Sequence, residues 1–140
     1  MRTERVRHVG IFTDKPERMM AFYEQALGFK KVWDEQENVK NITGMDINLR
    51  TIKMSSDNGS QIELLVQTEY KLGKRRQRYD SGGITHIALT VVDMIGIYGK
   101  CKEFGVEMLT GSIFTQDVGR KILFVKDPDG NVLELVEDPL

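Results

Sequence analysis

The sequence predicts an α+β fold made of two tandem βαβββ repeats that form a curved mixed sheet. Two observations carry this prediction. The segment HVGIFTD that begins at His8 resembles HIALTVVD at His86, and GSQIELLV from Gly59 matches GNVLELVE from Gly130. In each half, a stretch with helical periodicity and further strands lie between the two matching segments. Each half therefore runs from a strand with a histidine, through a helix, to a strand with a glutamate.

The first repeat spans about residues 5–67. Alternating apolar residues predict a strand at 6–12. An apolar stripe at helical spacing then predicts a helix that Gly28 ends, because glycine accepts the left-handed conformation after a last turn. Three further strands are expected near 29–35, 46–54 and 60–67.

The second repeat spans about residues 83–138 and follows the same order. A strand is expected at 84–92, and a helix from Asp93 to Phe104 that Gly96 and Gly99 weaken. Three further strands are expected near 106–109, 119–126 and 131–137.

Both repeats are expected to form a single domain over 1–140, joined by a linker at about 68–82. This linker is rich in basic side chains, and a solvated connection is the preferred interpretation. The alternative is a basic rim that meets an anionic tail on the substrate. No aromatic residues alternate with the charges as they would in a nucleic-acid site. The basic residues are Lys71, Lys74, Arg75, Arg76 and Arg78.

Composition narrows the classes of protein that the chain can represent. Its 140 residues carry a formal net charge of -1, so nothing points to nucleic acid or to an acidic membrane surface. The one cysteine, Cys101, excludes an internal disulfide and fits a reducing compartment. The first ten residues lack the apolar core of a signal peptide, and no apolar run reaches the length of a membrane span. We expect a cytoplasmic protein.

Alternation along the strands places one ionisable residue opposite the apolar face in four of them. An unpaired carboxylate there is costly to bury, and a divalent cation removes that cost. Two imidazoles and two carboxylates suit Zn, Ni, Co, Mn or Fe(II), and the lack of a thiolate argues against a closed structural zinc site. Each residue alone would more often be structural, but its recurrence in both repeats favours a set. The candidate metal ligands are His8, Glu63, His86 and Glu134.

Together these segments resemble the vicinal oxygen chelate superfamily, which has the glyoxalase-like fold. The resemblance covers essentially the whole chain. It rests on HVGIFTDKPERMMAFYEQALGF, IELLV, GGITHIALTV and RKILFVKDPDGNVLELVE. It implies that the same four residues hold one divalent metal ion, which binds two adjacent substrate oxygens and stabilises an enediolate or similar anion. By resemblance to glyoxalase I, Glu134 moves the proton and Glu63 faces it across the site.

The resemblance implies a metal-dependent lyase or isomerase that acts on a small-molecule substrate, similar to glyoxalase I. That enzyme's pattern has an Arg four residues after the first ligand His and an Asn four residues after the first ligand Glu. Here those positions hold Phe12 and Gln67. Phe12 cannot replace a guanidinium fork, which argues against glutathione as the substrate.

Several alternatives stay open. Methylmalonyl-CoA epimerase lacks that Arg, and Asp46 is a candidate for its second carboxylate, although a surface turn is the simpler role. Ring-cleaving dioxygenases of the superfamily need only His, His and Glu, but they tend to carry a Tyr where Ile122–Val125 stands. Fosfomycin-type resistance enzymes use the same three ligands. A non-catalytic binding protein would line a pocket with Phe12, Leu65 and Trp33.

Association is also implied by the resemblance. Family members of this size commonly form two-fold dimers, and some share the metal site between chains. We therefore expect a homodimer, whose four ligands come either from one chain or from two.

Overall fold

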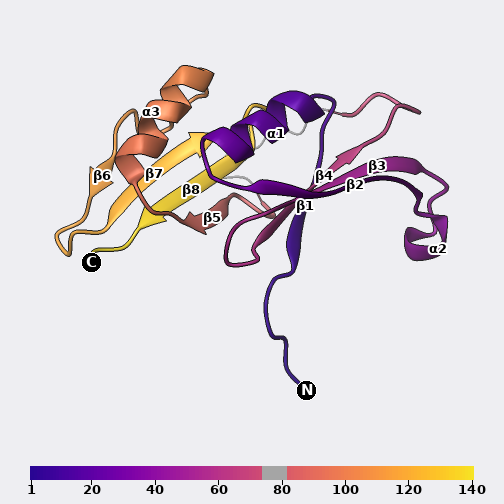
Figure 1. Ribbon diagram of the computed structural model, residues 1–140, viewed down its shortest axis with the longest axis horizontal. Helices are drawn as coiled ribbons and strands as arrows, with labels where there is room; N and C mark the ends of the chain where they lie inside the picture. Colours follow the sequence, from indigo (N-terminus) through magenta and orange to yellow (C-terminus); the bar gives the residue numbers. More distant parts are fainter. Residues whose placement is uncertain (74–81) are drawn as a thin grey trace. The chain divides into compact units, whose positions relative to one another are not determined.

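The computed structural model describes residues 1–73 and 82–140 (Figure 1). The chain divides into two compact units, Met1–Glu24 with Gly28–Lys74 and Gln25–Leu27 with Arg75–Leu140. Each unit holds the strands of one predicted repeat. Four of the five basic linker residues, Lys74 to Arg78, lie outside the described residues.

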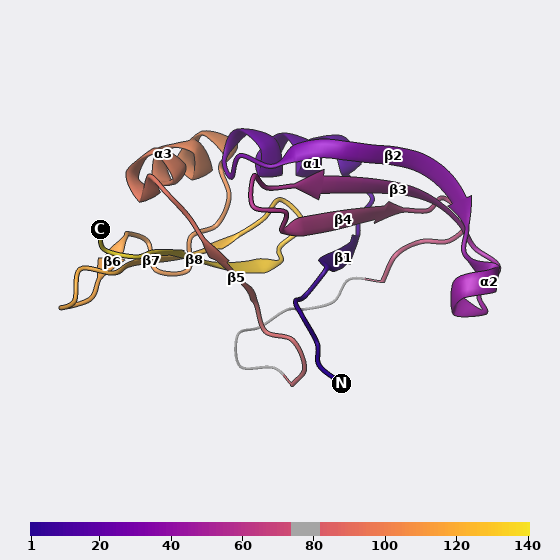
Figure 2. The same cartoon turned by 60° about the horizontal axis from the view of Figure 1, so that its bottom comes forward.

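The first unit contains a four-stranded sheet in the order β1-β4-β3-β2, and Figure 2 shows these strands one above another from β1 to β2. β1 and β4 run parallel, and the other neighbours are antiparallel. The elements of this repeat are β1 His8–Phe12, α1 Pro16–Gln25, β2 Lys30–Asn38, α2 Lys40–Thr43, β3 Asn48–Ser55 and β4 Gln61–Val66.

The helix α1 buries the apolar stripe expected from the sequence. Met19, Phe22 and Tyr23 are fully buried, and the Tyr23 ring meets Phe29 edge-on with 5.8 Å between ring centroids. The chain leaves the helix at Gly28, which has a positive φ of 73° and donates its N–H to the Glu24 carbonyl. A side chain at this φ would be strained, which explains the glycine.

The second unit repeats this topology. Its sheet has the order β5-β8-β7-β6, with β5 and β8 parallel and the other neighbours antiparallel (Figure 1). The helix α3 packs against β8. The predicted α+β fold of two βαβββ repeats is confirmed, with one mixed sheet in each unit. The elements of this repeat are β5 Ile87–Thr90, α3 Met94–Phe104, β6 Phe114–Thr115, β7 Lys121–Lys126 and β8 Val132–Glu137.

The start of α3 explains one of the two glycines that weaken the helix. The Asp93 carboxylate accepts a hydrogen bond from the Gly96 N–H at 3.0 Å, and a Cβ on Gly96 would clash with that carboxylate. Glu137 at the end of β8 accepts from the N–H groups of Asp93 and Met94. Its hydrogen bond with Lys121, followed by these backbone bonds, lowers the pKa of Glu137.

One expectation for the edge of the second sheet is wrong. The predicted strand at 106–109 is reduced to a single bridge between Met108 and Val125, and the fourth strand of the second sheet is β6. The chain turns directly after Met108: the Gly111 N–H donates to the Met108 carbonyl, and Gly111 has a positive φ of 67°. The short helix α2 is also not expected from the sequence; it ends at Gly44, whose N–H bonds to the Lys40 carbonyl.

The sheet face opposite the histidines and glutamates carries the core of each unit. Fully buried core residues of the two sheets are Ile52, Met54, Leu64, Leu123, Val125, Leu133 and Leu135.

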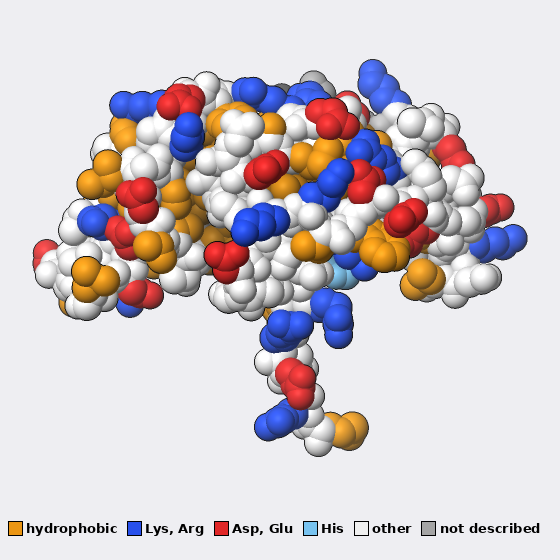
Figure 3. Space-filling model, viewed as in Figure 1, with side chains coloured by type: hydrophobic (Ala, Val, Ile, Leu, Met, Phe, Trp, Pro, Cys, Tyr) orange, Lys and Arg blue, Asp and Glu red, His pale blue; other side chains and the backbone are white. Residues whose placement is uncertain are grey.

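The described helices include none that is long and apolar enough to cross a membrane. The chain before β1 is exposed and bears several charged side chains (Figure 3).

Candidate functional site

Strands β1 and β4 bring the first predicted ligand pair together. Gly10 is the register partner of Glu63, so His8 lies two residues before that partner and on the same face of the sheet. The distance from His8 Nδ1 to Glu63 Oε2 is 3.6 Å. Only 15% of the Glu63 side chain is exposed. The alternation that placed both residues opposite the apolar face is therefore confirmed within this unit.

Strands β5 and β8 repeat the arrangement in the second unit. Ala88 is the register partner of Glu134, and His86 again lies two residues before that partner. The distance from His86 Nε2 to Glu134 Oε2 is 3.1 Å, and 24% of each side chain is exposed. The two pairs thus share not only residue types but also their register across parallel strands.

The imidazole of His86 is also held from its other side. The Thr85 hydroxyl lies 2.7 Å from Nδ1, and the Phe124 ring meets the imidazole at 5.6 Å between ring centroids. A hydroxyl can donate or accept a hydrogen bond, so Thr85 can hold the ring whether or not Nδ1 carries the proton. This contact leaves Nε2 directed at Glu134. Thr85 was not identified from the sequence, because a hydroxyl beside a histidine is common in any chain.

The separations within the pairs fit two ligands of one cation. Nitrogen and oxygen ligands lie about 2.0–2.2 Å from a metal such as zinc, so two of them are about 3 Å apart at a right angle and about 3.4 Å apart at a tetrahedral angle. The observed 3.1 Å and 3.6 Å are close to these values.

A single pair supplies two ligands, fewer than the three or four protein ligands of typical zinc sites. Within residues 1–73 and 82–140, no group of three or more His, Cys, Asp or Glu side chains forms a metal cluster. The structure brings each His–Glu pair together, and the joining of His8, Glu63, His86 and Glu134 around one ion stays a prediction.

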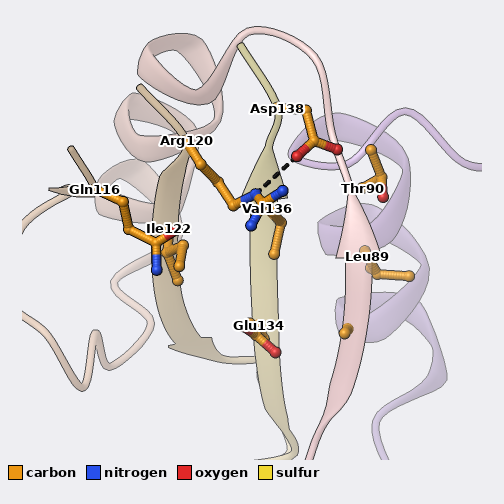
Figure 4. A pocket seen from close by; sticks show the side chains of 9 residues that line it. Leu89, Thr90, Gln116, Arg120, Ile122, Glu134, Val136 and Asp138 are labelled. Carbon is orange, nitrogen blue, oxygen red and sulfur yellow. Dashed lines mark hydrogen bonds and ion pairs between the residues drawn. The ribbon is translucent and has the colours of Figure 1, made fainter. Parts of the chain in front are cut away.

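The sheet face that carries Glu134 is hollowed. The hollow has a volume of about 370 Å³. Figure 4 shows Glu134 at one end, Arg120 and Asp138 at the other, and the apolar side chains of Ile122 and Val136 between them. The lining residues, all from the second unit, are Ala88, Leu89, Thr90, Gln116, Arg120, Ile122, Glu134, Val136 and Asp138.

Arg120 and Asp138 were missed by the sequence reasoning. The Arg120 Nε donates to Asp138 Oδ1 at 2.8 Å across the ends of β7 and β8. A signal was present, because strand alternation puts residues 120, 122 and 124 on the face of Glu134, to which Phe124 is paired. The family segment that contains position 120 did not by itself mark its charge as part of the site.

Gln67 lies at the start of the turn that follows β4. It is buried, and its side-chain carbonyl accepts from the N–H groups of Glu69 at 2.8 Å and Tyr70 at 2.9 Å. Its amide donates to the Tyr70 carbonyl. The side chain therefore closes the turn after β4.

The other singled-out residues of the first unit have mixed positions. Phe12 is 44% exposed and Trp33 is 46% exposed, with the Lys53 ammonium 5.4 Å from the Trp33 ring centroid. Leu65 is partly buried against a small core cluster. Asp46 lies before β3 and accepts from the Asn38 amide at 2.8 Å, as expected for a surface turn residue.

Comparison with known proteins identifies the family. The model of the Glyoxalase/Bleomycin resistance protein/Dioxygenase superfamily matches residues 5–135. Among curated proteins, YwkD from Bacillus subtilis (strain 168) is 29% identical over 134 residues, which are 94% of this chain and 95% of that protein. A 4-hydroxyphenylpyruvate dioxygenase from Aspergillus fumigatus is 29% identical over 103 residues, which are 69% of this chain and 25% of that protein.

Solved structures share the fold. A glyoxalase family protein from Bacillus cereus has a TM-score of 0.87 at 18% identity, over 98% of this chain and 95% of that one. A mutant of the fosfomycin resistance protein FosX from Listeria monocytogenes, in complex with Mn(II), has a TM-score of 0.68 at 14% identity, over 96% and 92%. The superfamily thus includes enzymes and proteins that bind a divalent metal. The chain belongs to the Glyoxalase/Bleomycin resistance protein/Dioxygenase superfamily.

Proposed function

We propose that the chain is a divalent-metal-dependent lyase or isomerase, similar in its reaction to glyoxalase I. In this proposal His8, Glu63, His86 and Glu134 hold one ion of Ni, Co, Zn, Mn or Fe(II). The observation that carries it is the recurrence of a His–Glu pair at the same register in both units. Each pair lies opposite the core face of its sheet, and two imidazoles with two carboxylates suit a divalent cation.

A divalent ion in this site would polarise two adjacent oxygens of a small-molecule substrate. The chain's own residues would do the remaining work. Glu134 lies between the fully buried Leu133 and Leu135, and its carboxylate opens into the hollow. In this proposal Glu134 takes a proton from the carbon beside a substrate carbonyl and returns it to the neighbouring carbon. Glu63 is the second candidate carboxylate.

The test of the proposed function starts from protein stripped of metal and reloaded with Ni, Co, Zn or Mn. The hemithioacetal of methylglyoxal and an acyl-CoA epimer are then assayed side by side. We expect one metal to restore turnover, and Glu134→Gln to remove at least about 99% of it, since proton transfer by a positioned group contributes about 10²–10⁴-fold. Glu103→Gln removes an exposed carboxylate from α3 and serves as the matched control.

Two results would contradict this proposal. Glu134→Gln protein that keeps its metal and full turnover would remove the role of Glu134. A chain that takes up none of the four metals and binds small apolar molecules equally well in chelator would instead be a non-catalytic binding protein.

We also propose a homodimer, and the two ligand pairs allow a direct test of whether the metal site is shared. Mixing Glu63→Gln with Glu134→Gln protein restores one intact site only if the first pair of one subunit meets the second pair of the other. Recovered metal binding in the mixture supports a shared site. If mass spectrometry shows that the two variants exchange subunits and metal binding is still not recovered, all four ligands come from one chain.

An oxygen-dependent dioxygenase is the second candidate. The 29% identity to the Aspergillus 4-hydroxyphenylpyruvate dioxygenase favours it, although the match covers a quarter of that enzyme. The measurement is oxygen uptake by Fe(II)-loaded protein with a catechol and with 4-hydroxyphenylpyruvate. Uptake with either compound, and no isomerase or lyase turnover, would favour this candidate over the first.

A further inference from the structure

We propose that Arg120 forms a subsite for an oxyanionic group of the substrate, a carboxylate or a phosphonate, at the end of the hollow away from Glu134. This inference rests on the proposed function, because it names the class of substrate that the same site accepts. The substrate would carry two adjacent oxygens at one end, a short apolar middle and an anionic group at the other end.

The guanidinium of Arg120 is held in place but is only partly used. Its Nε donates to Asp138 at 2.8 Å, and no hydrogen-bond partner for either Nη group exists among the residues that the structure describes. About 45% of the side chain is exposed. A guanidinium anchored through one edge keeps N–H donors in a fixed fork, which suits the two oxygens of a carboxylate or phosphonate.

The lining of the hollow sets the spacing between the two ends. Glu134 and Val136 lie on one face of β8, and Asp138 follows the strand, so each step of two residues covers roughly 7 Å. The apolar side chains of Ile122 and Val136 lie between the two charged ends (Figure 4). Gln116 and Thr90 add neutral hydrogen-bonding groups on the side of Arg120 (Figure 4). Such a lining fits a short apolar spacer better than a second charge.

The charge of the pair decides what the subsite prefers. Asp138 offsets the charge of Arg120, yet it occupies only Nε, so an anion can still approach the remaining donors. Removing the Asp138 carboxylate should therefore strengthen the binding of an anion and leave a neutral group unaffected. A purely structural Arg120–Asp138 pair predicts no such change.

The experiment uses two matched probes on Mn(II)-loaded protein, with binding measured by calorimetry. One is the monohydroxamate of succinic acid, which carries two adjacent oxygens and a distal carboxylate. The other is the hydroxamate of succinamic acid, in which a neutral amide replaces that carboxylate. We expect the carboxylate probe to bind the unmodified chain at least about tenfold more tightly, as for a hydrogen bond to a charged group.

The variants test whether Arg120 is the source of that preference. Arg120→Gln should abolish it while leaving the affinity for the amide probe unchanged, and Asp138→Asn should increase it. Arg2→Gln removes the same charge from the exposed segment before β1 and should leave the preference intact.

The outcomes separate this inference from the proposed function. Equal binding of the two probes, or a preference that survives Arg120→Gln, overturns the subsite and leaves the proposed function standing. A chain that takes up no metal and binds neither probe overturns the proposed function, and this inference falls with it.

Discussion

Replacing Thr85 by valine tests whether the contact behind His86 prepares that histidine to bind a metal. Valine keeps the branched shape of threonine but has no hydroxyl. The hydroxyl lies 2.7 Å from His86 Nδ1, and Nε2 lies 3.1 Å from Glu134. When Nε2 binds a cation, the ring proton must sit on Nδ1, where only an acceptor such as Thr85 Oγ1 can hold it.

The expected loss follows from that single hydrogen bond. Loss of a partner behind a metal-binding histidine lowers metal affinity about 10–100-fold, which is about 1.4–2.7 kcal/mol. The metal-free protein should lose only about 0.5–1.5 kcal/mol of its free energy of unfolding, the usual net contribution of one hydrogen bond. The loss of metal-binding free energy should therefore exceed the loss of unfolding free energy in the metal-free protein.

The assay is Mn(II) binding followed by electron paramagnetic resonance, together with urea unfolding of the metal-free protein. Thr85→Ser keeps the hydroxyl and should recover most of the affinity. Thr115→Val, on the exposed strand β6, is the control. Unchanged Mn(II) affinity in Thr85→Val protein would refute the reasoning, and so would an equal loss in the control.

Three further predictions concern stability and reactivity. Arg50 donates two hydrogen bonds of 2.8 Å to the Asp34 carboxylate. These bonds are the largest cause of a pKa of Asp34 that is lowered from 3.8 to about 2. A lowered pKa gives stability that is complete above about pH 4 and is lost as the pH falls toward about 2. Asp34→Asn should therefore reduce the free energy of unfolding by about 1–2 kcal/mol at pH 7 in urea unfolding, after allowance for solvent screening. The variant should also lose less stability than the unmodified chain between about pH 4 and about pH 2. Burial raises the pKa of the Cys101 thiol to about 11 from 9.0, so at pH 8 its reaction with Ellman's reagent should be about a hundredfold slower in the native protein than in urea; equal rates would contradict its burial. Leu135→Ala and its repeat equivalent Leu64→Ala should each cost about 2–5 kcal/mol by the same unfolding assay, because both side chains are fully buried, and a cost below about 1 kcal/mol in either would contradict the packing.

The order of strands and helices was accessible from the sequence because it depends on local periodicity. Alternation with a period of two fixed which face of β4 and β8 carries the glutamates, and a stripe at helical spacing identified α1. Internal repetition then added information that no single segment holds. The edges of the sheets were less accessible. β6 has two residues, and the segment at Met108 forms one bridge, so neither leaves a periodic pattern.

Residue spacing was enough to place two histidines and two glutamates at equivalent positions of the two repeats, opposite the core. Which atoms meet depends on the folded chain, because pairing across parallel strands joins residues far apart in the sequence, as with the 3.1 Å contact of His86 and Glu134. The same long-range pairing placed Arg120 beside Asp138 and opened the hollow between them and Glu134. A strand's own periodicity fixes the face of a side chain, but its neighbour's register fixes the partner.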